Sequence, residues 1–113
     1  MKLLGLDVGD RRIGVAVSDA TGLIATPLEI VHRTSRVQDF RRIASLLREQ
    51  QAGGLVVGLP PNDAGSAIPQ AQRIARYVAA LAAAPRTDGL DVPIIFSSAR
   101  VSTQRAHYAI LLT

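Results

Sequence analysis

The sequence predicts an α/β fold in which a mixed five-stranded sheet carries helices on its faces. Three observations predict it: short apolar runs fill the first third of the chain, the apolar period then changes to that of a helix, and helical segments alternate with apolar runs afterwards. The predicted order is β-β-β-α-β-α-β-α, a meander followed by alternating units. With 113 residues, the chain has room for a single domain, residues 1–113.

The predicted strands are apolar runs bounded by turn residues. The first run ends in Asp-x-Gly, and the turn residues 9–12 return the second strand antiparallel to the first. Pro27 predicts an edge or a bulge in the third strand. The five strands are predicted over residues 2–8, 13–18, 23–31, 55–59 and 92–96.

The predicted helices begin at capping signals. Ser35-x-x-Gln38 matches a capping box and starts the first helix, which the glycines at 53 and 54 end. A second helix starts near Ser66 with Pro69 in its first turn, and a third covers Gln104–Leu112. The apolar face of the first helix is predicted to consist of Val37, Phe40, Ile43, Ala44 and Leu47.

Composition excludes several classes of protein. The chain has no cysteine, so it has neither a disulfide framework nor a cysteine metal site. No apolar run reaches the roughly 20 residues that cross a bilayer, and the N-terminus lacks the pattern of a signal peptide. We therefore expect a cytoplasmic location and no membrane partner.

The charge balance indicates a phosphate-bearing partner. Thirteen basic residues face nine acidic ones, for a net charge of +4, and twelve of the thirteen are arginine, the side chain that forks onto phosphate oxygens. A solvated, arginine-rich surface explains the same balance equally well. Because only 4% of the residues are aromatic, any nucleic acid should be held through its backbone rather than by base stacking.

Asp7 is the sharpest candidate for chemistry. A carboxylate on an apolar strand is costly to bury unless it is paired or binds a metal, and Gly9 lets a backbone or a phosphate come close. The functional interpretation makes Asp7 a metal ligand. The structural alternative is an Asp that caps the turn or pairs with Arg11.

Four segments resemble a known family: GLDVGDRRIGVAVSD, TGLIATPLEIV, VVGLPPNDAGS and ARVSTQRA. They are similar to the YqgF/RuvX-type proteins, bacterial RNase H-like Holliday-junction resolvases that are also described as nucleases of the 16S ribosomal RNA precursor. The resemblance runs from Lys2 to about Ala106. It implies an RNase H-like fold, phosphodiester hydrolysis with Mg²⁺ or Mn²⁺, and Asp7 as the catalytic, metal-binding acid of the first strand.

The chain departs from the family pattern at its C-terminal end. Where the family has Asp-Glu-Arg-Leu-[Ser/Thr]-Thr, this chain has Ser98-Ala99-Arg100-Val101-Ser102-Thr103, and it ends at Thr113, before a further helix that bears another Asp. The last helical element is therefore expected to be short. Asp63, after the fourth predicted strand, is a candidate replacement ligand, although its loop also suits an ordinary turn Asp.

The arginines near these motifs are candidate phosphate ligands. With Gly9, we predict a nucleic-acid site formed by Arg11, Arg12 and Arg100, and the alternative for these arginines is a salt bridge to Asp7 or Asp10. The helical arginines are expected to be solvated unless a continuous stripe joins them to Asp7. They are Arg36, Arg41, Arg42, Arg48, Arg73 and Arg76.

Three hypotheses follow for function. The first is a metal-dependent nuclease that acts on structured RNA or on a DNA junction. The second is an inactive module of the same fold that binds nucleic acid or assembles with a partner, and the third is a shortened or altered form of an active nuclease. A missing final helix would expose apolar residues such as Ile110, which predicts a homodimer or another covering partner.

Overall fold

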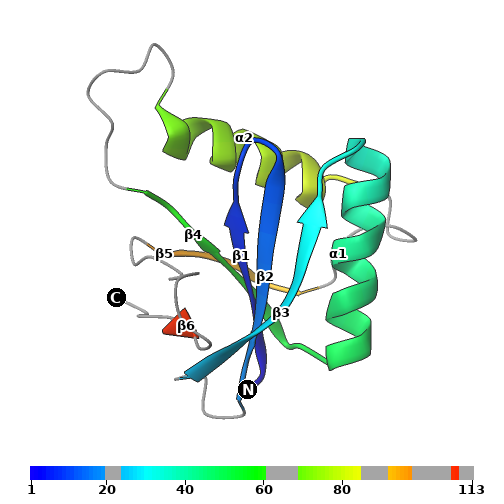
Figure 1. The fold of residues 1–113 in the computed structure, drawn as a ribbon, viewed down its shortest axis with the longest axis vertical. Helices are drawn as coiled ribbons and strands as arrows, with labels where there is room; N and C mark the ends of the chain where they lie inside the picture. The colour runs from blue at the N-terminus through cyan, green and yellow to red at the C-terminus, as the bar shows by residue number, and fades with distance from the viewer. Residues whose placement is uncertain (20–23, 61–68, 85–91, 98–107, 110–113) are drawn as a thin grey trace.

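A computed structural model describes residues 1–19, 24–60, 69–84, 92–97 and 108–109 of the chain. The predicted order, a strand meander followed by alternating helices and strands, is confirmed from the first strand to the fifth (Figure 1). The elements are β1 (Leu3–Val8), β2 (Arg12–Ser18), β3 (Ile24–His32), α1 (Arg36–Gln50), β4 (Gly54–Gly58), α2 (Gln70–Ala82), β5 (Ile94–Ser97) and β6 (Tyr108–Ala109).

The strands form one mixed sheet in the order β5-β4-β1-β2-β3-β6. β1 pairs antiparallel with β2 and parallel with β4, and β5 extends the parallel side. β2 pairs antiparallel with β3, and the register shifts between Val15 and Ala16 opposite Pro27, which is the predicted bulge. The predicted five strands are thus confirmed, with β6 as a two-residue addition at the β3 edge.

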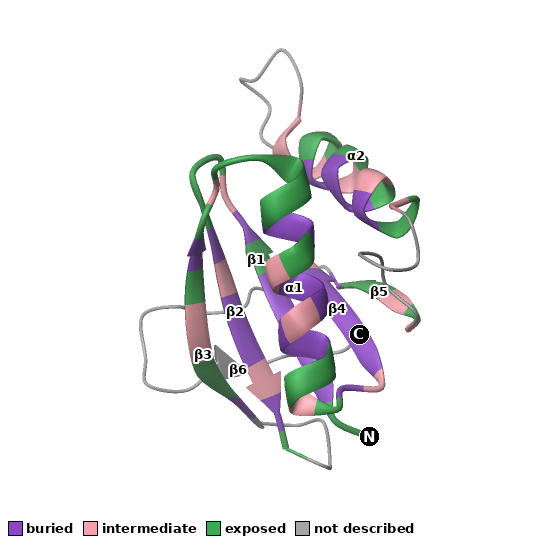
Figure 2. Cartoon of the chain, turned by 90° about the vertical axis from the view of Figure 1, so that its right-hand side faces the viewer, coloured by how far each residue is buried: buried purple, intermediate pink, exposed green. Residues whose placement is uncertain are grey.

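Both helices cover the same face of the sheet. Leu4, Leu6 and Val8 of β1 share one core cluster with apolar residues of α1 and α2, whereas Leu3 belongs to a smaller cluster on the other face. This follows from the alternation of side chains along a strand. In Figure 2, α1 lies across the strands with its buried side toward them. Neither of these two helices is long and apolar enough to cross a membrane.

The start of α1 follows the capping chemistry that its sequence predicts. Ser35 is the N-cap, and its Oγ accepts a hydrogen bond from the Gln38 backbone N–H at 3.2 Å. The Gln38 side chain accepts from the Thr34 hydroxyl at 3.0 Å, which ties the loop before the helix to its first turn. The helix ends at Gln51, whose left-handed φ of 52° closes it one residue before a buried alanine.

The prediction for the inward face of α1 was wrong at its first turn. Val37 is 57% exposed, and Asp39 takes the inward position with only 3% exposure. A carboxylate can occupy that position because three groups around it supply hydrogen bonds or charge, as described below. The two residues are about 200° apart around the helix. Val37 has helical spacing from Phe40 but lies outside the buried stripe, whereas Asp39 lies within it.

The third helix, predicted over Gln104–Leu112, was also wrong at its centre. Tyr108–Ala109 form β6, which pairs with Ile24 and Ala25 of β3. An edge strand offers unpaired backbone groups, and an aromatic residue suits a strand, so pairing here replaces the local helical hydrogen bonds. The rest of that segment lies outside the described residues. α2 begins at Gln70 with Pro69 as its N-cap.

Candidate functional site

Asp7 lies on the face of the sheet opposite the two helices, in a row of residues that runs across the strands. Its neighbours in β1, Leu6 and Val8, belong to the helix-covered core, so the alternating side chain of Asp7 points to the other face. Gly14 lies opposite Asp7 on β2. On β4, Gly58 follows the pair formed by Leu6 and Val57 and so comes beside Asp7.

Two further register partners complete this row. Gly58 pairs with Ser97 of β5, and Gly14 pairs with Ile30 of β3. We call these five residues the Asp7 row: Ser97, Gly58, Asp7, Gly14 and Ile30. Its carboxylate is flanked on both sides by glycines, which have no side chain to cover it. Gly58 could not be predicted as a neighbour of Asp7, because parallel pairing between β1 and β4 cannot be derived from local sequence.

The Asp7 carboxylate is accessible and has no hydrogen bond or ion pair among the described residues. Asp7 is classed as exposed, yet the surrounding chain displaces part of its water, and this burial raises the pKa of Asp7 above its ordinary value of 3.8. The alternative pairing with Arg11 is therefore not formed in the described part of the chain. An unpaired carboxylate with a raised pKa is stabilised by any cation that reaches it.

The hairpin after Asp7 places two arginines beside the row. Gly9 donates its N–H to the Arg12 carbonyl at 2.8 Å, and a Cβ at Gly9 would lie 2.8 Å from that oxygen, so the turn itself requires glycine. Arg12 is exposed and shares the face of Asp7, because the next residue, Ile13, is in the helix-covered core. Arg11 is exposed in the turn, and its carbonyl accepts from the Arg33 N–H at 2.9 Å.

The described residues contain no group of three His, Cys, Asp or Glu side chains that could hold a metal ion. Asp7 alone can supply one or two oxygen ligands, which fits a Mg²⁺ ion that keeps most of its waters better than a pair of ions held by protein carboxylates. The candidate ligand Asp63, the arginine Arg100, and Ser98 and Ala99 lie outside the described residues. Their predicted roles therefore stay predictions.

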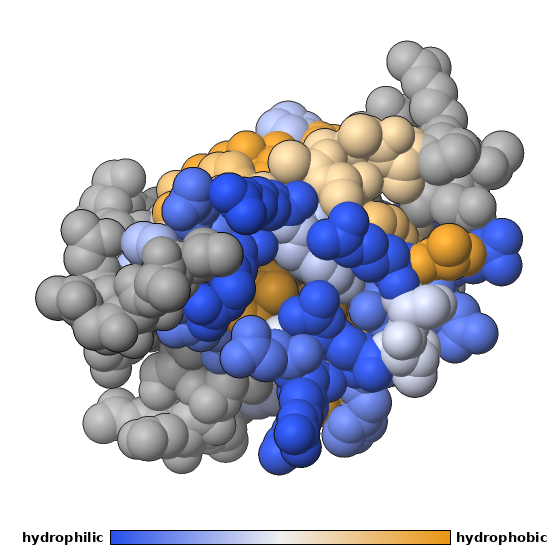
Figure 3. Space-filling view, turned by 90° about the horizontal axis from the view of Figure 1, so that it is seen from above, coloured by the Kyte–Doolittle hydropathy of each residue, from blue (hydrophilic) through white to orange (hydrophobic). Residues whose placement is uncertain are grey.

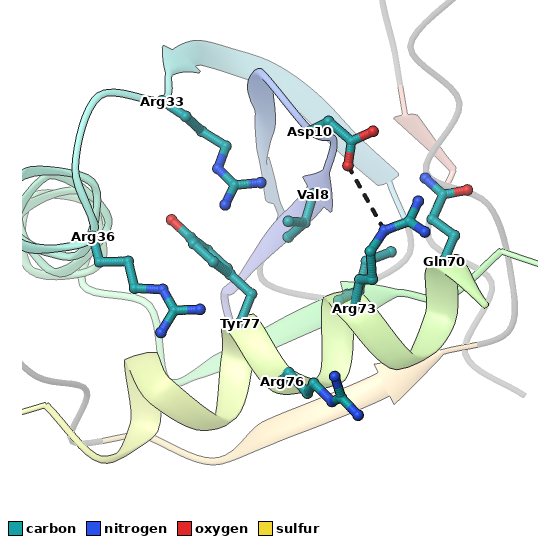
Figure 4. Close-up of a pocket in the computed structure, with 9 residues that line it drawn as sticks. Val8, Asp10, Arg33, Arg36, Gln70, Arg73, Arg76 and Tyr77 are labelled. Atoms are coloured by element: carbon teal, nitrogen blue, oxygen red, sulfur yellow. Dashed lines mark ion pairs between the residues drawn. The ribbon is translucent and has the colours of Figure 1, made fainter. Parts of the chain in front are cut away.

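A second feature lies at the same end of the sheet on the helix-covered face. It is a cavity of about 350 Å³ between the β1–β2 hairpin, the start of α1 and α2, and we call it the arginine groove. Figure 4 shows side chains from all three elements directed toward it, and Figure 3 shows hydrophilic side chains around a hollow with hydrophobic atoms in it. Its basic lining residues are Arg33, Arg36, Arg73 and Arg76.

One wall of the arginine groove is a buried polar network centred on Asp39. The carboxylate of Asp39 accepts from the Tyr77 hydroxyl at 3.1 Å and from the Thr34 backbone N–H at 3.1 Å. The Arg33 guanidinium lies over the Tyr77 ring, with 4.3 Å from Cζ to the centroid, and its Nε is 4.0 Å from Asp39 Oδ2. This network fixes Arg33 and Tyr77 in one arrangement.

Arg33 also joins the groove to the hairpin beside Asp7. The Nη1 atom of Arg33 donates a hydrogen bond to the Gly9 carbonyl at 2.7 Å. The Tyr77 ring packs edge-on against Phe40, with 5.2 Å between centroids, so α1 and α2 hold the same network. Arg33, Asp39 and Tyr77 were not predicted as site residues. The sequence signal for this network was Asp39 itself, an acidic residue in the first turn of an amphipathic helix.

The remaining arginines of the groove differ in their pairing. Arg73 Nε is 3.9 Å from Asp10 Oδ1, a surface pair in which the Asp10 side chain is 81% exposed. Arg36 and Arg76 have no acidic partner within the described part of the chain, and both are exposed. Asp7 is not among the lining residues of the groove, so in the described part of the chain no continuous stripe of arginines joins the helices to that carboxylate.

Comparison with known proteins places this chain in a family. A model described as "RuvX: Holliday junction resolvase" matches residues 1–112. The chain belongs to the RuvX family. This confirms the resemblance that the first-strand and loop motifs indicated.

Curated relatives agree with the family. A protein of Thermoanaerobacter pseudethanolicus named "Putative pre-16S rRNA nuclease" is 40% identical over 111 residues, which is 98% of this chain and 76% of that protein. A Synechococcus protein with the same name is 42% identical over 105 residues, 93% of this chain and 63% of that protein. The Roseobacter denitrificans protein of that name is 41% identical, and the match covers 65% of it. The RuvX-family chain thus spans less than two thirds of two of these three relatives.

Solved structures with the same fold include one in complex with a Holliday junction substrate. Thermus thermophilus RuvC, solved with a Holliday junction substrate, matches 86% of this chain and 64% of its own with a TM-score of 0.59 at 18% identity. Archaeoglobus fulgidus Pelota matches 87% of this chain and 27% of its own with a TM-score of 0.51 at 12% identity. At these identities the likeness shows a shared fold, and it confirms the predicted RNase H-like fold.

Proposed function

We propose that this chain is a nuclease that hydrolyses phosphodiester bonds in structured nucleic acid with a divalent cation, Mg²⁺ or Mn²⁺. The observation that carries the proposal is the setting of Asp7: an accessible carboxylate between two glycines, with no partner among the described residues, near the end of the first strand of a RuvX-family chain. The names of the curated relatives favour a precursor of 16S ribosomal RNA as the substrate, and a DNA junction is the other candidate.

Asp7 would hold the cation and Arg12 would hold the substrate phosphate. A bound divalent cation supplies positive charge to the attacked phosphate and makes bound water a better nucleophile. The two glycines beside Asp7 leave room for a phosphate on the sheet surface, and Arg12 on the same face can fork onto its oxygens. Arg11, Arg100 and Asp63 are proposed as further ligands of the substrate or the cation.

Asp7→Asn tests the proposal. It removes the anionic ligand and keeps the shape, so we expect Mg²⁺-dependent cleavage of a labelled RNA precursor or four-way DNA junction to fall by about 100-fold or more. The matched control is Asp19→Asn, which makes the same change at an exposed residue just after the far end of β2. Cleavage that survives in Asp7→Asn but requires the metal would remove Asp7 from the mechanism.

A second candidate function is an inactive module that binds nucleic acid. The observation that favours it is that Asp7 is a lone acid, with no group of three potential metal ligands among the residues described. This candidate predicts that the wild-type chain binds RNA or branched DNA in EDTA, with strong salt dependence, and cleaves neither substrate when Mn²⁺ is added.

A further inference from the structure

The arginine groove is a concentration of positive charge that the proposed nuclease chemistry at Asp7 does not use. Among the described residues four guanidinium groups line it, and Asp10 is the single acidic one. The groove opens on the helix-covered side of the sheet, whereas Asp7 and Arg12 lie on the other face. Like charges gathered at an open cavity repel one another, so the arrangement is stabilised by an anion that bridges them.

Two of the four arginines already contact other groups of the chain. Arg33 is held by Asp39, Tyr77 and the Gly9 carbonyl, and its side chain is 27% exposed. Arg73 faces Asp10 across 3.9 Å, an exposed pair whose charges are already solvated and which a phosphate can compete with.

Arg36 and Arg76 are the arginines that remain for a ligand. They come from different helices, the first residue of α1 and the middle of α2, and both line the groove. Neither has an acidic partner among the described residues. Two guanidinium groups that line one cavity from separate elements can each bind one of two neighbouring phosphates.

The other lining residues indicate what accompanies the phosphate. Val8 and Ile74 supply an apolar floor, and the Gln70 amide lies at the α2 end of the groove. Tyr77 offers no free ring face for stacking on this side, because Arg33 covers it and the hydroxyl is bonded to Asp39. Among the described residues the groove therefore suits a phosphate and its sugar, and it has no free aromatic face on which a base could stack.

We infer that the arginine groove is a second nucleic-acid site, in which Arg36 and Arg76 bind backbone phosphates away from the bond that is cleaved at Asp7. The inference rests on the proposed function for the nature of the ligand. Since the β1–β2 hairpin separates the groove from the Asp7 row, the bound backbone passes from one face of the sheet to the other over this hairpin. Binding at the groove is independent of metal and insensitive to base sequence.

The test is the double variant Arg36→Gln/Arg76→Gln, measured by fluorescence anisotropy with short labelled single-stranded RNAs in EDTA. For single strands each lost phosphate contact removes about 0.7 from the slope of log K against log salt, so we expect the slope to flatten by about 1.4. The RNAs are an oligouridylate and an oligoadenylate of equal length. Both should lose affinity to the same extent.

The matched control is Arg42→Gln/Arg48→Gln, which lowers the net charge by the same amount outside the groove. Arg42 is paired with Glu29, and Arg48 lies about 18 Å along α1 from Arg36, at 1.5 Å per residue. A slope that flattens equally in both double variants would show that net charge alone is responsible and would overturn the inference. Thermal midpoints of both variants confirm that each is folded.

Two further measurements identify the ligand and separate the two proposals. Inorganic phosphate and uridine monophosphate compete with the labelled RNA; if either displaces it at the same phosphate concentration as the oligonucleotide, the groove takes a small anion and the inference is wrong. Asp7→Asn should bind RNA in EDTA as wild type does. Lost cleavage in Asp7→Asn with an unchanged slope in Arg36→Gln/Arg76→Gln would keep the proposed function and overturn only the groove.

Discussion

The Asp7 row and the arginine groove lie at the same end of the sheet and are built from opposite kinds of residues. In the part of the chain that the structure describes, the row places one carboxylate between glycines without a partner, whereas the groove gathers four guanidinium groups around apolar side chains. The first arrangement suits a cation and the second suits an anion. One strand end can therefore present two electrostatic environments, because successive side chains of β1 point to opposite faces.

The hairpin of residues 9–12 joins these two environments. Arg33 in the groove donates to the Gly9 carbonyl, and Gly9 in turn donates to the Arg12 carbonyl. Arg12 then lies on the face of Asp7. A substitution that loosens Arg33 should therefore affect both the Asp7 row and the arginine groove.

Asp39→Ala is expected to have the largest effect on stability. It leaves the Tyr77 hydroxyl and the Thr34 N–H without their acceptor and removes the charge beside Arg33, so the free energy of unfolding should fall by about 3 kcal/mol. Urea denaturation at neutral pH measures this change. Faster amide exchange at Gly9 would show that the hairpin loosens as well.

Tyr77→Phe is the comparison variant for that network. It removes one hydrogen bond to a charged acceptor and keeps the ring under Arg33, so we expect a loss of about 1.5 kcal/mol. If Tyr77→Phe destabilises the chain more than Asp39→Ala does, the carboxylate is not the centre of the network.

These residues also mark the limit of what sequence could predict. The apolar strand that ends in a carboxylate identified Asp7, and the capping box identified Ser35, because both signals are local. Asp39 was missed because only apolar residues mark a helix face in a sequence: Val37 was included for its spacing, whereas a carboxylate on the buried side gives no such signal. Only the packed structure distinguishes them.

The arginine groove and the Asp7 row could not be predicted from local sequence patterns. Arg73 and Arg76 are three residues apart on α2, which is compatible with a solvated face, and their approach to Arg36 depends on how α2 packs against the hairpin. Likewise, Gly58 comes beside Asp7 only through the parallel register of β1 and β4. Non-local pairing also explains why the centre of the predicted third helix is a strand, because β6 pairs with the edge of β3.

Asp7→Asn should slightly stabilise the fold while it abolishes the proposed activity. Burial raises the pKa of Asp7, so the ionised form carries a cost in the folded chain at neutral pH that the neutral amide does not. Since the residue is exposed, solvent screening limits the gain to about 0.5 kcal/mol. The thermal midpoint of Asp7→Asn should exceed that of wild type at pH 7.

The pH dependence of that difference supplies the check. The folded pKa lies above the ordinary value of 3.8, so wild type takes up its proton and recovers stability as the pH falls through the folded pKa. The two midpoints should therefore converge as the pH approaches 3.8 and below. A variant that is less stable than wild type at pH 7 would mean that Asp7 has a stabilising partner in the folded chain.

Arg42→Gln should have the smallest effect, and it tests whether pairing, rather than position on a helix, separates the groove arginines from the others. Arg42 forks onto Glu29 with contacts of 2.8 and 2.6 Å, and this bond holds the pKa of Glu29 below 4.5. Because both side chains are partly exposed, the variant should lose only about 0.3 kcal/mol. That stabilisation is present above pH 4.5 and is lost as the pH falls through the folded pKa of Glu29.

Arg42 already has an anion, so its loss should leave the salt dependence of RNA binding almost unchanged, whereas Arg36→Gln alone should flatten the slope by about 0.7. Equal slopes for these two single variants of α1 would show that the acidic partner of an arginine does not decide whether it binds phosphate.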